Sequence, residues 1–98
     1  MENKLYRIRC SVSAHYAGNK EPCILYSNIR LTSKKKCAEE LFKEEYSIIS
    51  NFYKIAELKD CISTTQWIKF EVLIPDKIGE FSVIEKTIFK QCFKKAIT

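Results

Sequence analysis

The clearest pattern in the chain is an alternation of hydrophobic and polar positions from Leu5 to Tyr16. One side of this segment carries Tyr6, Ile8, Cys10, Val12, Ala14 and Tyr16, and the other carries Arg7, Arg9, Ser11, Ser13 and His15. Because successive side chains of a strand point to opposite faces of a sheet, a period of two predicts a half-buried β-strand.

A second strand is predicted directly after this one. Residues 17–22 have a loop composition, with Gly18, Asn19 and Pro22. Residues 23–31 are rich in β-forming side chains, and we expect Leu25, Ile29 and Leu31 to point inward. The two segments together predict an antiparallel hairpin.

A helical period follows the hairpin. Ser33 is a candidate N-cap, and the predicted helix ends near Asn51. Its apolar residues fall on one stripe, formed by Cys37, Ala38, Leu41, Phe42, Ile48 and Ile49. We expect this stripe to pack on the apolar face of the hairpin.

The second half of the chain suggests the same order of elements. Residues 53–62 predict a weaker strand, residues 63–65 a turn, and residues 66–74 a stronger strand that Pro75 stops. Ser82 and Glu85 have the spacing of a capping box, which predicts a final helix. The apolar face of that helix would consist of Phe81, Ile84, Ile88, Phe89, Cys92, Phe93 and Ala96.

These elements predict an α+β fold in a single domain over residues 1–98, in the order ββαββα. A chain of 98 residues has room for one modest core. A four-stranded antiparallel sheet with two helices packed on one face would bury both helical stripes and leave the other sheet face exposed.

The distribution of charge points to an anionic partner. The net charge is +5, and residues 1–36 hold eight basic side chains, including all three arginines, against Glu2 and Glu21. Such a basic region favours nucleic acid or an acidic protein surface.

Three consecutive lysines, Lys34, Lys35 and Lys36, stand where the first helix should begin. The first helical turn presents unpaired N–H groups, so each misplaced cation there costs about 0.3–1 kcal/mol. Either the lysines form a solvated cluster tolerated at small cost, or an anionic group docks on them.

The exposed face of the hairpin is a second candidate. If the hairpin pairs symmetrically about its loop, Arg9 lies opposite Arg30, and a bound anion would relieve their repulsion. Tyr26 and His15 on the same side could stack unpaired bases, although a solvated face with an incidental arginine pair is the ordinary alternative. The candidate binding residues are therefore Lys34, Lys35, Lys36, Arg7, Arg9, Arg30, Tyr26 and His15.

The sequence gives little support for a catalytic site, a metal site or a bound cofactor. His15 is the sole histidine and should face away from Cys10, which opposes a Cys–His pair. The five cysteines have no C-x-x-C spacing, so buried free thiols in a reducing, cytoplasmic compartment are expected instead of zinc ligands. No apolar run approaches the roughly 18 residues that span a bilayer, and no membrane association is expected. We expect neither an enzyme nor a bound metal or cofactor.

Two functional classes remain. The first is a non-enzymatic, stoichiometric binding or regulatory protein whose basic surface docks on an acidic protein surface or a nucleoprotein complex. In length and in its content of lysine and isoleucine, the chain resembles the general run of small phage and mobile-element proteins, some of which inhibit host defence systems. The alternative is a sequence-tolerant DNA- or RNA-binding protein that uses the same residues on phosphates. The sequence leaves the partner and the oligomeric state open.

Overall fold

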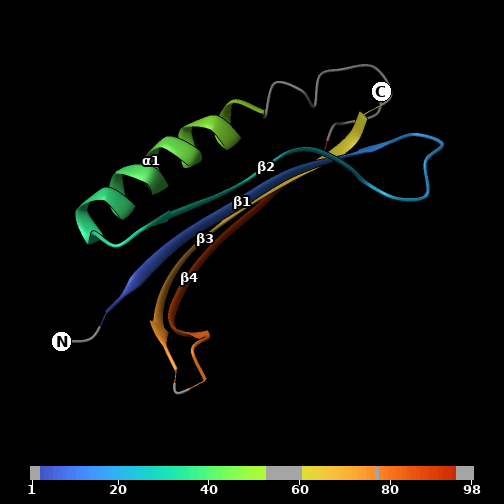
Figure 1. The fold of residues 1–98 in the computed structure, drawn as a ribbon. Helices are drawn as coiled ribbons and strands as arrows, with labels where there is room; N and C mark the ends of the chain where they lie inside the picture. The colour runs from blue at the N-terminus through green and yellow to red at the C-terminus, as the bar shows by residue number, and fades with distance from the viewer. Residues whose placement is uncertain (1–2, 53–60, 77, 95–98) are drawn as a thin grey trace.

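The computed structural model describes residues 3–52, 61–76 and 78–94 of the chain. Within them the order of elements is β1 (Leu5–Tyr16), β2 (Cys23–Thr32), α1 (Lys35–Asn51), β3 (Cys61–Pro75) and β4 (Phe81–Lys94). The four strands form one antiparallel sheet in the order β2-β1-β3-β4. Helix α1 packs across β2, β1 and β3 on one face, here called the helix face (Figure 1). No described element covers the opposite side, here called the open face.

The core lies between α1 and the two central strands. The apolar side of β1, as its alternation predicts, is buried there with residues from α1 and β3. The buried cluster consists of Tyr6, Ile8, Cys10, Val12, Ala38, Ile49, Ile68 and Val72. Leu41 and Phe42 of α1 pack against it and are partly buried. Two features of the prediction are thus confirmed, the β1–β2 hairpin and the helix that packs on it.

The helix begins differently from the prediction. The N-cap is Lys34 and not Ser33, and no side chain makes a capping hydrogen bond. The Lys34 backbone N–H donates instead to Thr32 Oγ1 at 3.3 Å. Since the first turn also lacks an acidic residue, the stability of α1 comes from its packing on the sheet and not from its N-terminus.

The prediction of a second helix, and with it the order ββαββα, is wrong. Residues 81–94 form β4, which pairs with β3 from Phe81 opposite Pro75 to Lys94 opposite Ser63. The apolar spacing here is compatible with either structure, but the β-branched side chains Val83, Ile84, Thr87 and Ile88 favour a strand, and β3 offers it an edge to pair with. Ser82 does not act as a cap, because its hydroxyl donates to Asp76 Oδ2 at 3.3 Å.

The boundaries of β3 also correct the prediction. Residues 63–65, predicted as a turn, lie inside β3, and most of the strand predicted over residues 53–62 lies outside the described residues. Pro75 ends β3 as predicted. The turn that follows is organised by Asp76, whose Oδ1 accepts from the backbone N–H groups of Ile78 and Glu80, and by Gly79 at φ +89°.

The register of β2 against β1 differs by one residue from symmetrical pairing. Arg9 lies opposite Ile29, and Arg30 lies opposite Ile8. A slip of one residue moves every side chain of a strand to the other face of the sheet. Ile29 and Leu31 therefore lie on the open face, 62% and 57% exposed, instead of inward as predicted. Leu25 does pack against the core.

The molecule is long and thin, with principal extents of 58 × 26 × 15 Å (Figure 1). Its accessible surface is 7096 Å², whereas a monomer of 11.5 kDa is expected to expose about 5,800 Å². A sheet that the described elements cover on one face only contributes to this large surface. Among the residues that the structure describes, no helix has the length and apolar character needed to cross a membrane.

Candidate binding face and two carboxylate clusters

A buried carboxylate on the helix face joins α1 to the sheet. Glu45 is fully buried and accepts hydrogen bonds on both oxygens. Its Oε2 accepts from Tyr26 Oη at 2.6 Å and from Cys10 Sγ at 3.3 Å. Its Oε1 accepts from Asn28 Nδ2 at 2.8 Å and from Arg30 Nη1 at 3.2 Å. We call these five residues the Glu45 cluster.

The Glu45 cluster is arranged to hold a negative charge without water. Burial alone would raise the pKa of Glu45, but the hydrogen bonds from Tyr26, Cys10, Asn28 and Arg30 outweigh it and keep the pKa below its ordinary value of 4.5. Burial, followed by the hydrogen bond to Glu45, raises the pKa of the Cys10 thiol to about 12. Because a nucleophilic cysteine must be a thiolate, Cys10 is a structural hydrogen-bond donor.

A second buried carboxylate lies on the open face. Glu71 of β3 is 1% exposed and lies directly opposite Arg7 of β1. Arg7 donates from Nε at 3.2 Å and from Nη2 at 3.0 Å, and Arg9 donates from Nε at 2.6 Å and from Nη2 at 3.2 Å. Burial would raise the pKa of Glu71, but the two guanidinium groups lower it below 4.5. We call these three residues the Glu71 cluster.

The open face around the Glu71 cluster is basic. The pairing places Lys86 beside Glu71, Lys69 beside Arg9 and Lys90 beside Trp67 on the same side of the sheet. The Lys69 ammonium lies 4.6 Å from the centre of the Trp67 ring. Glu71 is the one carboxylate that the described strand residues place on this face.

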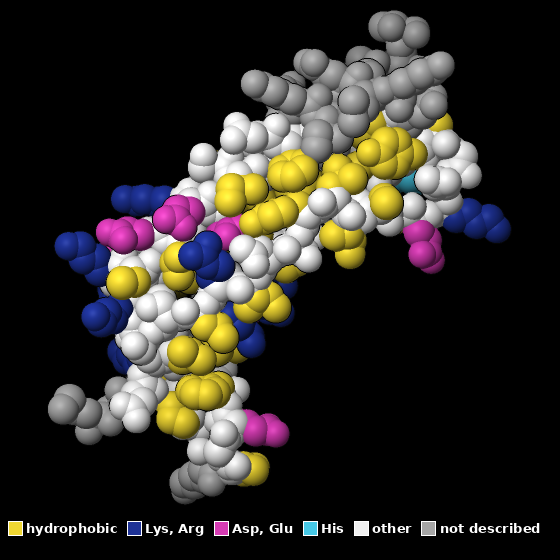
Figure 2. Space-filling view, turned by 45° about the horizontal axis from the view of Figure 1, so that its top comes forward, with side chains coloured by type: hydrophobic (Ala, Val, Ile, Leu, Met, Phe, Trp, Pro, Cys, Tyr) yellow, Lys and Arg dark blue, Asp and Glu magenta, His cyan; other side chains and the backbone are white. Residues whose placement is uncertain are grey.

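Exposed apolar side chains flank this basic centre along both edges of the sheet. The β2 edge presents Ile24, Ile29 and Leu31, and the β4 edge presents Phe81, Val83, Ile84 and Ile88. Each of these seven side chains is at least 46% exposed. Figure 2 shows one view of the molecule, in which hydrophobic side chains form a broken band along the long axis with both basic and acidic side chains beside it. Exposed apolar patches are typical of protein-binding sites, and here two of them lie on either side of a charged centre.

The structure separates the residues that the sequence grouped into one basic surface. Arg7 and Arg9 lie on the open face, whereas Tyr26 and Arg30 belong to the Glu45 cluster on the helix face. The expected opposition of Arg9 and Arg30 is absent, because the register places Ile29 beside Arg9. His15 Nε2 lies 2.8 Å from the carbonyl oxygen of Asn19, in the loop that follows β1.

The lysines at the start of α1 form a separate positive region. Lys34, Lys35 and Lys36 are exposed and make no ion pair with the described part of the chain. They lie next to the end of β2 and not on the open face. A ligand on these lysines would therefore occupy a different place from a ligand on Arg7 and Arg9.

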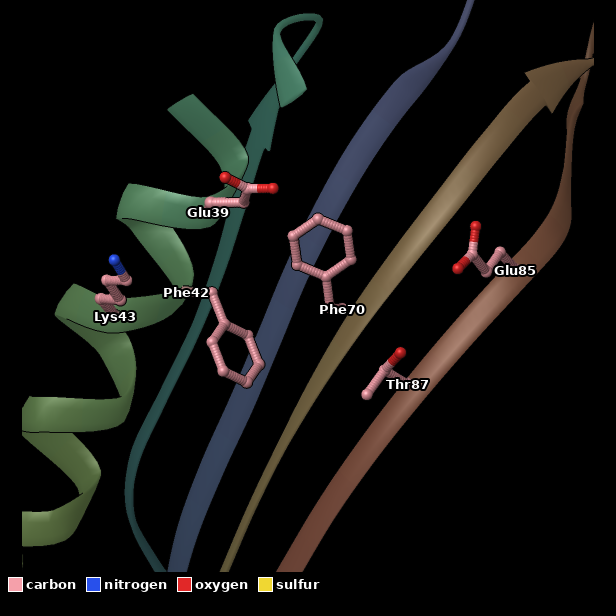
Figure 3. Close-up of a pocket in the computed structure, with 6 residues that line it drawn as sticks. All are labelled: Glu39, Phe42, Lys43, Phe70, Glu85 and Thr87. Atoms are coloured by element: carbon pink, nitrogen blue, oxygen red, sulfur yellow. The ribbon is translucent and has the colours of Figure 1, made fainter. Parts of the chain in front are cut away.

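A groove of about 290 Å³ lies between α1 and the strands β3 and β4 on the helix face. Phe42 of α1 and Phe70 of β3 form its apolar floor (Figure 3). Glu39 and Lys43 border it on the helix side, and Glu85 and Thr87 border it on β4. The Tyr46 ring of α1 contacts the Phe89 ring of β4, with centroids 5.2 Å apart, and in the described part of the chain no second helix packs on this side of the sheet.

The cysteines are free, but only part of the expectation for them is met. Cys10 and Cys61 are buried, whereas Cys23, Cys37 and Cys92 are exposed. Burial as small hydrophobic residues thus accounts for two of the five. Within the described ranges, no group of three His, Cys, Asp or Glu residues could hold a metal ion.

Sequence reasoning missed the two buried carboxylates. Glu45 could have been found, because it lies seven positions after Ala38 and four before Ile49, on the apolar stripe of α1. A charged residue at such a position needs buried partners. Glu71 carries no comparable local signal, since its partners Arg7 and Arg9 are recognised only once the β1–β3 pairing is known.

A scan against protein-family models, a search of curated proteins and a search of solved structures each found no match to this chain. The chemistry of the two sheet faces is therefore the basis for a functional assignment.

Proposed function

We propose that this protein is a non-enzymatic, stoichiometric binding protein that docks its open face on an acidic protein surface, either of a single protein or of a protein within a nucleoprotein complex. The observation that carries the proposal is the composition of that face. Arg7, Arg9, Lys69, Lys86 and Lys90 surround Glu71, and exposed aliphatic residues lie on both sides. Basic side chains complementary to an acidic surface raise the association rate, and the apolar margins supply area to bury.

The same face suits a protein better than a nucleic acid. Arg7 and Arg9 already donate to Glu71, and Tyr26 and Arg30 lie on the other side of the sheet. Trp67 has Lys69 over its ring. Single-stranded nucleic acids bind on aromatic platforms, whereas the margins here are mostly isoleucine, leucine and valine, which pack against protein side chains.

A standard protein interface buries about 800 Å² on each partner. The open face offers a partner exposed apolar side chains along both the β2 edge and the β4 edge. A small protein bound in this way would act by blocking the surface it covers, which is the inhibitory role that the sequence suggested.

Site-specific photo-cross-linking tests the proposal. A photoreactive residue replaces Ile29 or Ile88 on the open face, or Glu40 on the solvent side of α1 as the matched control. In nuclease-treated extract of the source cells we expect Ile29 and Ile88 to capture the same defined protein and Glu40 to capture none. Lys69→Glu with Lys86→Glu should abolish capture, and Lys35→Glu with Lys36→Glu, the same change in charge at the start of α1, should leave it intact.

Three outcomes would contradict this assignment. Capture that nuclease removes would make nucleic acid the ligand. Capture that depends on Lys35 and Lys36 but not on Lys69 and Lys86 would move the site to the helix start. Capture of many unrelated proteins in equal yield would indicate a nonspecific cationic surface.

A further inference from the structure

β4 forms one edge of the sheet in the described part of the chain. β4 spans Phe81–Lys94, which is 14 residues, and it is the last strand of the sheet. No strand of the described chain pairs with its outer side (Figure 1). Helix α1 contacts the helix face of β4 through Tyr46, whose ring centroid lies 5.2 Å from that of Phe89. An edge strand presents unpaired backbone N–H and C=O groups, which can pair with the backbone of another chain.

The two faces of β4 carry different side chains beside this edge. On the open face Lys86, Ile88 and Lys90 alternate along the strand, and Ile88 is 55% exposed. On the helix face Thr87 borders the groove whose floor is Phe42 and Phe70 (Figure 3). A strand added at this edge would thus meet a row of positive charge on one side and an apolar groove on the other.

We propose that this edge is a strand-addition site, at which an extended acidic segment of the partner protein pairs with β4. The inference rests on the proposed function and specifies how the partner is held. Backbone hydrogen bonds to the edge supply affinity, and side-chain contacts on alternating positions supply specificity.

A second copy of this chain is a poor occupant. An antiparallel β4–β4 pair that keeps side chains on matching faces would bring Lys86 and Lys90 of both copies together on one side of the joined sheet. Like charges on neighbouring strands destabilise the pairing, and lysines on edge strands are a known protection against self-association. An acidic strand would be attracted to Lys86 and Lys90 where a second copy of β4 would be repelled.

The geometry sets the composition of the added strand. In antiparallel pairing its residues opposite Lys86 and Lys90 are acidic, and the residue opposite Ile88 is aliphatic. The residue opposite Thr87 points to the helix face and is long and apolar, because it has to reach Phe70 in the groove. Read from its amino end, the segment is acidic, any, aliphatic, long apolar, acidic.

Titration with a synthetic peptide tests this assignment. The probe reads glutamate, threonine, isoleucine, leucine, glutamate, with threonine and serine extensions, and its binding to the full chain is followed by NMR and amide hydrogen exchange. We expect saturable shifts on β4 and slowed exchange at alternate β4 amides. Substituting both glutamates by lysine should weaken binding at least about tenfold, and methylating the backbone nitrogens that face β4 should do the same.

Protein variants supply the matched controls. Lys86→Glu with Lys90→Glu should lose the peptide and gain the lysine version of it, whereas Lys35→Glu with Lys36→Glu should bind as the parent does. Strand addition would be overturned if the methylated peptide bound as well as the parent peptide, if the two charge versions bound equally, or if no peptide bound. If photo-cross-linking from Ile29 persists in any of these cases, the proposed function stands and only the β4 edge is excluded as its means.

Discussion

The two buried carboxylates, Glu45 and Glu71, lie on opposite faces of the same sheet and are held in different ways. Glu45 comes from the helix and takes most of its hydrogen bonds from the neutral donors Tyr26, Asn28 and Cys10. Glu71 comes from a central strand and is held by two arginines from the neighbouring strand. The first carboxylate joins two layers of the fold, and the second joins two strands within one layer.

This difference separates a structural role from a surface role. Loss of Glu45 would leave four donors from β1 and β2 without their acceptor, the buried Cys10 thiol and the part-buried groups of Tyr26, Asn28 and Arg30. Loss of Glu71 would release Arg7 and Arg9, which are about a third exposed and can be solvated where they lie. We therefore assign stability to the Glu45 cluster and the organisation of the binding face to the Glu71 cluster.

The largest expected effect is that of Glu45→Ala. The substitution removes a fully buried acceptor from four donors, of which Arg30 is 38% exposed, so we expect a loss of about 3–5 kcal/mol, and urea denaturation measures the change. Glu44→Ala is the matched control, because the Glu44 side chain is 60% exposed and approaches Arg30 only at 3.6 Å. A surface pair of that kind is worth at most about 1 kcal/mol. Equal effects of the two substitutions would show that the cluster does not hold α1 on the sheet.

A smaller destabilisation is expected for Glu71→Gln. The amide keeps the shape and one acceptor, and the freed guanidinium groups gain water, so a loss of about 1–3 kcal/mol is expected in the same urea experiment. If this substitution costs as much as Glu45→Ala, the open face is also part of the core, and the distinction between the clusters fails.

Stability should fall at acidic pH because of both clusters. The folded-state pKa values of Glu45 and Glu71 are lowered from 4.5, so the unfolded chain takes up protons first as the pH falls. Their contribution is complete above the ordinary value and is lost as the pH falls through the lowered values. Thermal unfolding between about pH 3 and pH 7 should show this loss of stability at low pH. The dependence of stability on pH should be shallower in Glu45→Gln and in Glu71→Gln than in Glu44→Gln. An unchanged slope in the first two would contradict the arrangement.

The smallest expected change in stability is that of Leu31→Ala, which tests whether the open face lies outside the core. Leu31→Ala should change the free energy of unfolding by no more than about 0.5 kcal/mol, since Leu31 is exposed on the open face. Ile49→Ala, in the core on the helix face, should cost about 2–5 kcal/mol. A cost for Leu31→Ala similar to that of Ile49→Ala would mean that β2 has the register in which Leu31 points inward.

Local periodicity was sufficient for the elements whose patterns have one interpretation. The alternation from Leu5 to Tyr16 predicted β1 with its bounds, and the stripe from Ala38 to Ile49 predicted α1. Residues 81–94 were different, because their apolar spacing fits a helix or a strand and the free edge of β3 decides between them. Secondary structure there depends on a partner that is distant in sequence.

The candidate site was less accessible to sequence reasoning than the fold. Arg7 and Arg9 were placed correctly on the polar side of β1, but a register change of one residue moved Arg30 and Tyr26 to the opposite face. That register accompanies a bulge between Val12 and Ser13, for which the sequence has no evident signal. The exposure of Ile29 and Leu31 on the β2 edge follows from the same slip, whereas the apolar residues of the β4 edge depend on the β3–β4 pairing.

The most direct test of the account is the photo-cross-linking yield from Ile88 in Glu71→Gln compared with Glu45→Gln, at a temperature where both are folded. The account predicts that Glu71→Gln captures the same partner in higher yield at low ionic strength, because the open face loses its carboxylate, and that added salt removes the gain. Glu45→Gln should capture the partner as the parent does. A yield that falls in Glu45→Gln and stays unchanged in Glu71→Gln would contradict the assignment of binding to the open face.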